Sequence, residues 1–267
     1  MNGLGFIGFG KMAYAIAKGI VNSSFLPNNN IFAYDINKEF LEIKTSELGI
    51  NFCADENELL NKVDAVLIAT KPFVVDDVLE SIKYNADNKL VISILAGIPT
   101  ERFEEKLKGA RVIRVMPNTP AMVNEGMSVV CRGNLATDDD VEFVRNMFLK
   151  LGDAICLDES LINAVTAVSG SGPAFYYYII DKIARAGEML GLSREVALKL
   201  SAQTALGAAK MIMTTGFEPD ELIKAVTTPN GTTAEGNKVL VESDIERVLF
   251  ETVNKTCKRA IELGIKK

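Results

Sequence analysis

The sequence contains no histidine among its 267 residues. Without an imidazole, the chain cannot form a Ser-His-Asp hydrolase site, a Cys-His protease site or a histidine-based zinc site. The His-Asp acid and base pair of 2-hydroxyacid dehydrogenases is excluded for the same reason. We therefore expect a reaction that needs no imidazole, and we assign no metal ligands.

Cysteine is sparse as well, and its distribution argues against disulfide bonds. Cys53, Cys131, Cys156 and Cys257 lie far apart and show no paired spacing. A chain of this length needs no disulfide framework, so we interpret all four as reduced core residues, as is usual in the cytoplasm. Residues 4–7 already look like a first strand, so no signal peptide is expected before the fold. We therefore expect a cytoplasmic protein.

The sequence also lacks a basic excess and an apolar run that could span a membrane. The formal net charge is -6 and the pI is about 5.0, which leaves no basic surface for nucleic acid. The longest apolar stretch, residues 164–184, is interrupted by the segment 169–173 and by Asp181. These interruptions exclude a membrane span. Neither nucleic acid nor a membrane is therefore expected as a partner.

The first half of the chain alternates short aliphatic runs with amphipathic segments, which is typical of a parallel sheet with crossover helices. We predict strands over residues 4–7, 31–34, 65–69, 90–95, 112–115, 127–131 and 154–157. Helices are predicted over residues 11–21, 38–48, 74–84, 100–107 and 138–151. The expected fold class is α/β, with a doubly wound sheet that binds its ligand at the carboxyl ends of the strands.

Strand signals stop after Asp158, and helix-forming residues dominate from there on. We therefore predict two domains, an α/β domain of residues 1–157 and an all-helical domain of residues 158–267. Clusters of Gly, Pro, Ser and Thr predict breaks between the helices at residues 169–173, 191–193, 216–219 and 227–233. Residues 176–180 would place apolar side chains all around one helix. Such a helix is either wholly internal or covered by a second copy, and we favour a dimer.

The first motif with chemical meaning is Gly8-Phe9-Gly10-Lys11-Met12-Ala13. A Gly-x-Gly-x-x-Ala pattern alone is weak evidence, but this one follows a strand and opens a helix. Gly8 can make the tight turn, Gly10 lets the backbone approach a pyrophosphate, and Ala13 permits close packing of helix on strand. We therefore assign Gly8, Gly10, Lys11 and Met12 to a dinucleotide cofactor rather than to a purely structural turn.

Asp35 stands at the end of the next predicted strand, about 25 residues after Gly10. A carboxylate there accepts hydrogen bonds from the adenosine ribose and repels a 2'-phosphate, which favours NADH over NADPH. Lys38 lies close enough to weaken this preference, and Asp35 has an alternative role as a cap of the following turn. The predicted cofactor is therefore NADPH or NADH, with Asp35 favouring NADH.

Three later strand ends carry turns that could enclose the rest of a cofactor. The assigned residues are Ala69, Thr70, Lys71 and Pro72 after one strand, Ala96 and Gly97 after the next, and Asn118 within residues 116–120. Pro72 and Pro99 also suit the start of a helix, so the first two turns have a structural interpretation as well. The Asn118 amide could reach the nicotinamide carboxamide or the substrate, or belong to a plain turn.

Taken together, these segments resemble the pyrroline-5-carboxylate reductase family, over essentially the whole chain. The resemblance is carried by residues 8–13, 69–72, 93–98, 114–120, 169–174 and 226–233, in this order. It implies a Rossmann domain and an all-α dimerisation domain that builds the substrate site from two subunits, with larger rings of dimers in some members. The implied reaction is hydride transfer from NAD(P)H to the C=N bond of 1-pyrroline-5-carboxylate, which gives L-proline.

The resemblance also implies where the substrate binds. The implied substrate-binding residues are Asn230, Gly231, Thr232, Thr233 and Ser171, and the hydroxyl of Thr233 takes the catalytic role of orienting the imine nitrogen. Asn230 stands where the family commonly has glycine, and Asn237 stands where it usually has an aliphatic residue. Because asparagine tolerates left-handed backbone angles, Asn230 can keep the turn.

The same loop has a chemical interpretation without the family. Its threonine hydroxyls and free backbone N–H groups at a helix start suit a carboxylate, although Thr232 or Thr233 is also expected to be an ordinary N-cap. A cyclic imine can arrive already protonated from water, so its reduction needs no strong protein acid, in keeping with the missing histidine.

Two other functions fit less well. A β-hydroxyacid dehydrogenase would need a lysine shortly after the glycine-rich segment that ends at Gly172, whereas the next lysine is Lys182. A catalytically silent sensor of dinucleotide or proline would not need the intact threonine-rich loop.

Overall fold

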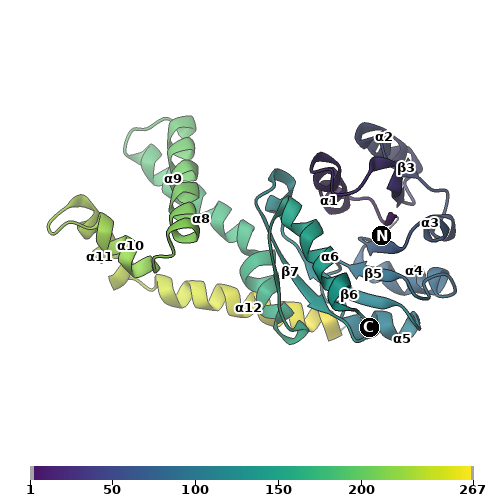
Figure 1. Cartoon of the computed structure of the whole chain (residues 1–267). Coiled ribbons are helices and arrows are strands. Elements are labelled where there is room, and N and C mark those ends of the chain that lie inside the picture. The colour runs from purple at the N-terminus through teal and green to yellow at the C-terminus, as the bar shows by residue number, and fades with distance from the viewer. Residues whose placement is uncertain (1–2, 266–267) are drawn as a thin grey trace. The chain divides into compact units, whose positions relative to one another are not determined.

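The computed structural model describes residues 3–265, which form two compact units (Figure 1). Residues 3–171 together with 256–265 make an α/β unit, and residues 172–255 make a helical unit. The last strand ends at Cys156, next to the expected domain boundary at residues 157 and 158. The compact units separate later, between Ser171 and Gly172. The predicted fold class, an α/β sheet followed by helices, is confirmed.

The sheet of the first unit has the order β3-β2-β1-β4-β5-β6-β7-β8. Its strands are β1 Leu4–Ile7, β2 Ile31–Tyr34, β3 Asn51–Phe52, β4 Ala65–Ile68, β5 Leu90–Ser93, β6 Arg111–Met116, β7 Gly126–Arg132 and β8 Gly152–Cys156. Neighbouring strands run parallel except β6 and β7, which are antiparallel with Met116 opposite Val129. The connection between these two strands is too short for a crossover helix, so β7 departs from the parallel pattern that the alternation of strands and helices predicts.

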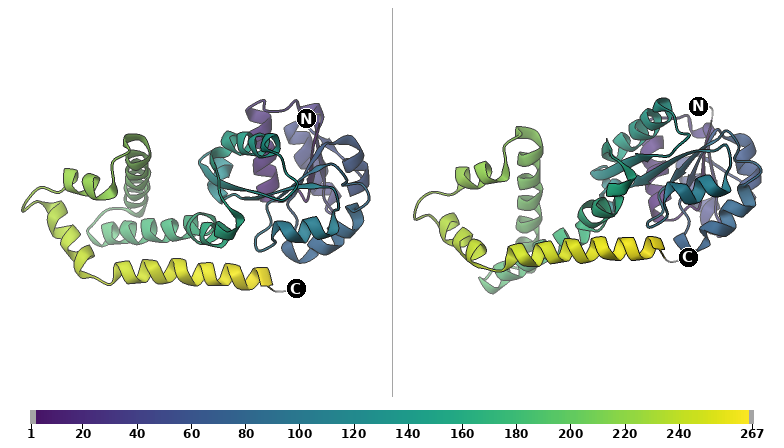
Figure 2. Two further views of the ribbon diagram at one scale, coloured as in Figure 1. Left: turned by 60° about the horizontal axis from the view of Figure 1, so that its bottom comes forward. Right: turned by 90° about the horizontal axis from the view of Figure 1, so that it is seen from below.

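Helices cover both faces of the sheet because its central strands are apolar on both sides (Figure 2). Every residue of β1, β4 and β5 is buried. One apolar cluster, with Ile16 and Phe148, packs α1, α2 and α6 on one face, and a second, with Leu79 and Phe103, packs α3, α4 and α5 on the other. These helices are α1 Lys11–Asn22, α2 Lys38–Leu48, α3 Glu56–Lys62, α4 Val75–Ile82, α5 Thr100–Lys106 and α6 Asp138–Phe148.

Each predicted strand and helix of this unit is present, with ends shifted by a few residues. Among the strands and α-helices up to β8, the short strand β3 and the helix α3 were not predicted. Seven residues of α3 are too few to show a clear helical period, although Asp55 provides an N-cap by accepting from the Glu58 N–H at 2.8 Å. The predicted helix 74–84 begins instead with a 3-10 turn, Pro72–Val74, before α4.

The chain continues into helices after the sheet. They are α7 Ile162–Val165, a π-helical turn Thr166–Gly170, α8 Gly172–Met189, α9 Arg194–Thr215, α10 Pro219–Val226, α11 Thr232–Glu242 and α12 Ile245–Ile265. The predicted breaks coincide with the start of α8 and with the ends of α8, α9 and α10. The break at Ser243 and Asp244, before α12, carries no Gly or Pro and was not predicted.

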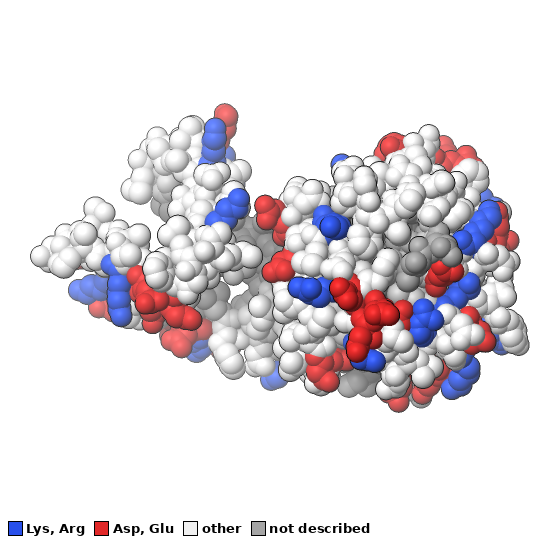
Figure 3. Space-filling view, in the orientation of Figure 1, with Lys and Arg blue, Asp and Glu red and all other residues white. Residues whose placement is uncertain are grey.

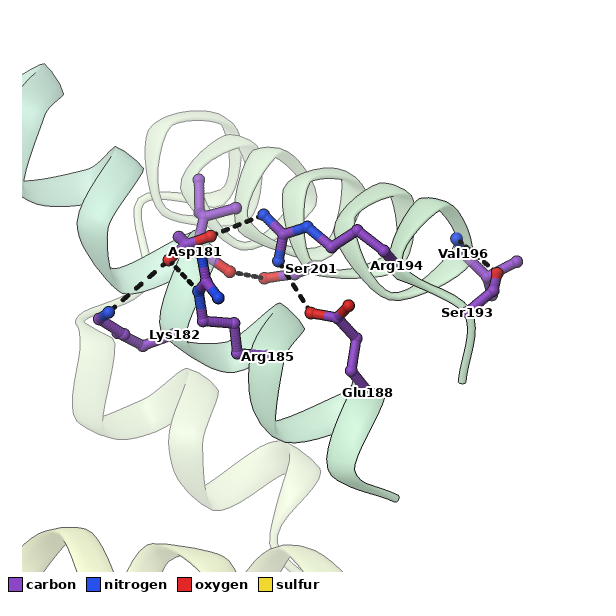
Figure 4. Close-up of polar contacts among 9 residues, drawn as sticks. Asp181, Lys182, Arg185, Glu188, Ser193, Arg194, Val196 and Ser201 are labelled. Atoms are coloured by element: carbon purple, nitrogen blue, oxygen red, sulfur yellow. Dashed lines mark hydrogen bonds and ion pairs between the residues drawn. The ribbon is translucent and has the colours of Figure 1, made fainter. Parts of the chain in front are cut away.

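Polar contacts join α8 to α9 within the helical unit (Figure 4). The Asp181 carboxylate accepts hydrogen bonds from Arg185 Nε at 2.8 Å and from Arg194 Nη2 at 2.6 Å, and these bonds lower its pKa. Arg194 also pairs with Glu188 at 3.3 Å, and Ser201 Oγ donates to a backbone carbonyl of α8 at 3.0 Å. The polar residue that interrupts the apolar stretch therefore fixes one helix against the next.

Much of the apolar surface of the helical unit is exposed in the single chain. Tyr176, Tyr177 and Tyr178 expose 65%, 62% and 65% of their surface. In Figure 3, wide uncharged areas separate the charged groups of this unit. The alternative of a wholly internal helix is therefore wrong. Among the described helices, none combines the length and the apolar content that crossing a membrane requires.

The four cysteines carry free thiols. Cys53 and Cys131 are buried, and burial raises the pKa of these thiols to about 11 and about 12. Cys156 is exposed and Cys257 is half-buried, so the prediction of four core cysteines is correct for two of them.

A buried carboxylate fixes the start of α6. The side chain of Asp140 accepts hydrogen bonds from Arg111 Nε at 2.8 Å and from the N–H and hydroxyl of Thr137 at 2.9 and 2.8 Å. In return, Thr137 Oγ1 accepts from the Asp140 N–H, which completes a capping box. Burial alone would raise the pKa of Asp140, but the bonds from Arg111 and Thr137 outweigh it and lower the pKa.

Replacing Asp140 with alanine should lower the free energy of unfolding by about 2 kcal/mol, because a guanidinium and a helix cap lose a charged acceptor. Asp139→Ala is the matched control, since it removes an exposed acid from the same helix turn and should cost less than about 1 kcal/mol. Because folding lowers the pKa of Asp140, the carboxylate contributes fully to the free energy of unfolding above the usual Asp pKa near 4. This contribution is lost as the pH falls below that value and the carboxylate is protonated. Urea unfolding of both variants, from neutral to acid pH, measures these free energies of unfolding. Equal losses of stability in the two variants would contradict the role of Asp140 in fixing the start of α6.

Candidate functional site

The parallel strands bring the predicted cofactor residues to one edge of the sheet. β1 leads into Gly8, β2 into Asp35, β4 into residues 69–72, β5 into Ala96 and Gly97, and β6 into Asn118. From β1 the chain order runs one way to β2 and β3 and the other way to β4, β5 and β6. This reversal is the place where doubly wound sheets bind their ligands.

Gly8 is the residue around which this edge is packed. Its φ is +85°, a left-handed angle that other residues rarely adopt, and its N–H donates to the Tyr34 carbonyl at 2.9 Å. A Cβ at this position would lie 2.9 Å from the carbonyl carbon of Ala69 and from the nitrogen of Thr70. Gly8 therefore joins the ends of β1, β2 and β4 without leaving room for a side chain.

Gly10 differs from Gly8 because the space beside it is open. A Cβ built on Gly10 would meet nothing within 4 Å, and the residue itself is exposed. Gly10 is the N-cap of α1 and provides no side-chain cap, so the first N–H groups of the helix remain available to an anion. Lys11 beside it is exposed, whereas Met12 is half-buried against the core.

Asp35 ties the glycine turn to the end of β2. Its Oδ2 accepts from the Phe9 N–H at 2.7 Å, and its Oδ1 accepts from the Asn37 N–H at 2.9 Å. The alternative role as a turn cap is therefore real. A carboxylate has about four lone-pair sites, so two backbone bonds leave capacity for ribose hydroxyls. The ribose contact of Asp35 stays a prediction.

The turn after β4 contains a buried hydroxyl without a partner. Thr70 Oγ1 is inaccessible to solvent and makes no hydrogen bond in the described structure. Lys71 and Pro72 are exposed, and Pro72 begins the 3-10 turn, as its structural interpretation predicts. An unsatisfied buried hydroxyl costs free energy, so its presence beside Gly8 favours a ligand-binding role for this turn.

Asn118 is a link between segments. It is buried, its Oδ1 accepts from the Met127 N–H at 2.9 Å, and its Nδ2 lies 3.3 Å from both the carbonyl and the hydroxyl oxygen of Ser169. The amide thus joins the turn after β6 to β7 and to the π-helical turn, a type of turn that is frequent at functional sites. Its predicted contact with cofactor or substrate stays a prediction. Ser169, which contacts the Asn118 amide, is not among the residues that the sequence assigns to the site.

Ser171 closes the π-helical turn, with its N–H donating to the Thr166 carbonyl at 2.8 Å. It is the last residue of the sheet unit before the chain enters the helical unit at Gly172. The other predicted substrate residues belong to the helical unit, in the loop between α10 and α11 and in the first turn of α11.

The loop between α10 and α11 is held by its own residues. Asn230 has φ +60°, which confirms the left-handed turn expected of an asparagine there. Gly231 is tight against Thr228, because a Cβ on Gly231 would lie 2.4 Å from Thr228 Oγ1. Gly231 is also the N-cap of α11 and has no side-chain cap, so the expectation that Thr232 or Thr233 is the N-cap is wrong.

The hydroxyls of Thr232 and Thr233 are consequently not used in capping, and both residues are exposed. Asn237, the second departure from the family pattern, donates through Nδ2 to Thr227 Oγ1 at 3.0 Å. Thr227 in turn donates to the Ile223 carbonyl at 2.6 Å. The loop therefore presents two free hydroxyls at the first turn of a helix, an arrangement suited to a carboxylate.

No cluster of metal-ligating side chains is present in the described part of the chain. The candidate residues offer backbone N–H groups that can bind anions and hydroxyls that can bind polar groups.

Gly8→Ala and Gly10→Ala should separate folding from ligand binding. Gly8→Ala should lower stability by at least about 1 to 2 kcal/mol, because the residue must keep a left-handed angle against β4. Gly10→Ala should leave thermal unfolding of the free protein unchanged but weaken NADH and NADPH binding by at least about tenfold, because its Cβ fills the approach to the pyrophosphate. Differential scanning fluorimetry and dinucleotide titration test both; normal binding by Gly10→Ala would remove this turn from the cofactor site.

Two family models match the chain. Residues 159–263 match the family described as pyrroline-5-carboxylate reductase dimerisation, and residues 3–97 match the family described as NADP oxidoreductase coenzyme F420-dependent. The first match covers the helices that follow the sheet, and the second covers β1 to β5 with the glycine turn.

Relatives and solved structures agree with these matches over nearly full length. Pyrroline-5-carboxylate reductase of Methanosarcina acetivorans is 40% identical over 265 residues, 98% of each chain, and that of Arabidopsis thaliana is 40% identical over 98% of this chain and 95% of its own. The Coxiella burnetii pyrroline-5-carboxylate reductase structure gives a TM-score of 0.94 at 30% identity, covering 99% of both chains. The Plasmodium falciparum pyrroline carboxylate reductase structure, with NADP bound, gives 0.88 at 30% identity over 98% of both. The chain therefore belongs to the pyrroline-5-carboxylate reductase family.

Proposed function

We propose that the chain reduces the C=N bond of 1-pyrroline-5-carboxylate with a hydride from NAD(P)H, which gives L-proline in the last step of proline biosynthesis. The observation that carries this proposal is the 40% identity to a pyrroline-5-carboxylate reductase over 98% of both chains. The open glycine turn and the uncapped threonine loop supply the two binding elements that such a reaction needs.

The dinucleotide supplies the hydride, and the edge of the sheet holds the dinucleotide. The N–H groups from Gly10 to Met12 receive the pyrophosphate, and Asp35 receives the ribose of the adenosine. The remainder of the dinucleotide is enclosed by the turns after β4 and β5 and by the side chain of Asn118. Each of these contacts would replace a contact between the dinucleotide and water by one with a fixed protein dipole. Fixed contacts favour one orientation of the nicotinamide ring.

The threonine loop holds the substrate. The N–H groups of Asn230 and Thr232 and the Thr232 hydroxyl bind its carboxylate beside Gly231 and together with Ser171, and the Thr233 hydroxyl orients the ring nitrogen. The Gly231 N–H does not take part, because it donates to the Thr228 carbonyl at 2.9 Å. The hydride adds to the carbon of the C=N bond, and the nitrogen keeps the proton that it has taken from water. The product is a neutral amine, so the reaction needs no proton from an imidazole. Positioning, rather than acid catalysis, then supplies most of the rate enhancement.

Two chains are proposed to act together. A dimerisation family matches residues 159–263, and exposed apolar side chains on α8 are available to be covered. In this proposal residues 1–157 bind the dinucleotide, and residues 158–267 form the homodimer and build the substrate site from two subunits. Larger rings of dimers and a cytoplasmic location, where the four thiols stay reduced, are parts of the same proposal.

The Asp35 carboxylate is proposed to favour NADH. If its charge repels the 2'-phosphate, kcat/KM should be about tenfold higher with NADH than with NADPH at low salt. Lys38→Ala should lower kcat/KM for NADPH further and leave that for NADH unchanged, because only the phosphate would use this cation. Steady-state rates with both cofactors decide the matter, and a preference for NADPH would remove Asp35 from ribose recognition.

Thr233→Ala should lower kcat by about ten- to a hundredfold, because the imine nitrogen loses the group that orients it. Thr233→Ser keeps a hydroxyl and should retain most of the activity. Dinucleotide binding, followed by fluorescence titration, should be the same in both variants and in the wild type. Unchanged turnover in Thr233→Ala would show that another group orients the substrate.

A further inference from the structure

The end of α12 touches the turn that follows β5. Residues 256–265 belong to the same compact unit as the sheet. A Cβ built on Gly264 would lie 2.9 Å from the carbonyl oxygen of Gly97, and a Cβ built on Gly97 would lie 3.3 Å from the nitrogen of Gly264 and from the carbonyl carbon of Leu263. Two backbones are therefore in direct contact, and neither residue can carry a side chain without moving the other.

This contact matters because little else restrains the turn. Gly97 has φ +78°, and Ala96 is exposed. The preceding Leu95 is held by its buried side chain and by its N–H, which donates to Ser93 Oγ at 3.3 Å. For Ala96 and Gly97, the described part of the chain provides no backbone hydrogen bond. Packing against α12 is thus the main restraint on the position of Gly97.

We propose that Gly264 is a positioning residue for cofactor binding. By leaving a gap on the surface of α12, it lets the helix backbone rest on Gly97 and hold the turn of Ala96 and Gly97 in the shape that receives the dinucleotide. The inference rests on the proposed function, since it requires that this turn binds NAD(P)H.

The placement also makes α12 part of the cofactor site without any contact to the ligand. α12 is one continuous helix from Ile245 to Ile265 (Figure 2). A displacement of the last turns of α12 would remove the packing against Gly97. The turn of Ala96 and Gly97 would then lose its fixed conformation before the cofactor binds.

Gly264→Ala tests this proposal. Alanine is the better helix former, so the substitution should not weaken the helix itself. Its Cβ would push the Gly97 carbonyl away, and the dissociation constants for NADH and NADPH, measured by fluorescence titration without substrate, should rise by about three- to tenfold. The KM for pyrroline-5-carboxylate should change less than the KM for the dinucleotide. Glu262→Ala, an exposed change in the same helix turn, is the matched control and should leave dinucleotide binding unchanged.

Dinucleotide binding by Gly264→Ala at the strength of the wild type would overturn the inference. So would a fall in the thermal unfolding midpoint with unchanged dinucleotide affinity, because a purely structural contact would behave in that way. Weaker binding in both Gly264→Ala and Glu262→Ala would also overturn it, since the effect would not depend on Gly97. A wild-type protein that binds neither dinucleotide would refute the proposed function first, and this inference with it.

Discussion

The close approach of Gly8 to β4 is the constraint on which the cofactor edge depends. The chain must turn out of β1 at a left-handed angle while its backbone lies against the peptide between Ala69 and Thr70. This geometry makes Gly10 the N-cap of α1, so the N-terminus of the helix lies at the carboxyl end of the strands. It also brings the Phe9 N–H within reach of Asp35. A larger residue at position 8 would disturb strand, helix and carboxylate together.

The sequence predicts the α/β half well because both faces of the sheet are buried. Runs such as residues 65–68 and 90–92 are apolar at each position, which distinguishes buried parallel strands from amphipathic helices. The elements that escape prediction are those whose formation depends on tertiary contacts. β3 has two residues and gains its place by pairing with β2, and the direction of β7 follows from the length of its connection. The π-helical turn likewise has no compositional signal, and the Asn118 side chain helps to fix it.

The sequence offers candidate site residues where the proposed chemistry requires a particular residue type. Gly8 and Gly10 stand out by sequence, yet only the structure separates their roles, one filling a tight turn and one leaving space. Asp35 and Asn118 were singled out for ligands, and both also hold backbone groups of other segments. Such double use cannot be recognised from spacing, because it depends on which N–H groups the fold brings within reach. The N-cap of α11 was misassigned for a related reason: Gly231 takes the extended conformation, and the threonines enter the helix.

The bond from Asn237 to Thr227 shows that the threonine loop is not a self-sufficient module. The Thr227 hydroxyl donates its proton to the Ile223 carbonyl, so its oxygen is free to accept a hydrogen bond. The donor of that bond is Asn237, in the second turn of α11. This hydrogen bond therefore links Thr227 in the loop to Asn237 inside α11. If the loop were transplanted into a relative with an aliphatic residue at position 237, Thr227 would lose the hydrogen-bond donor that it has in this chain.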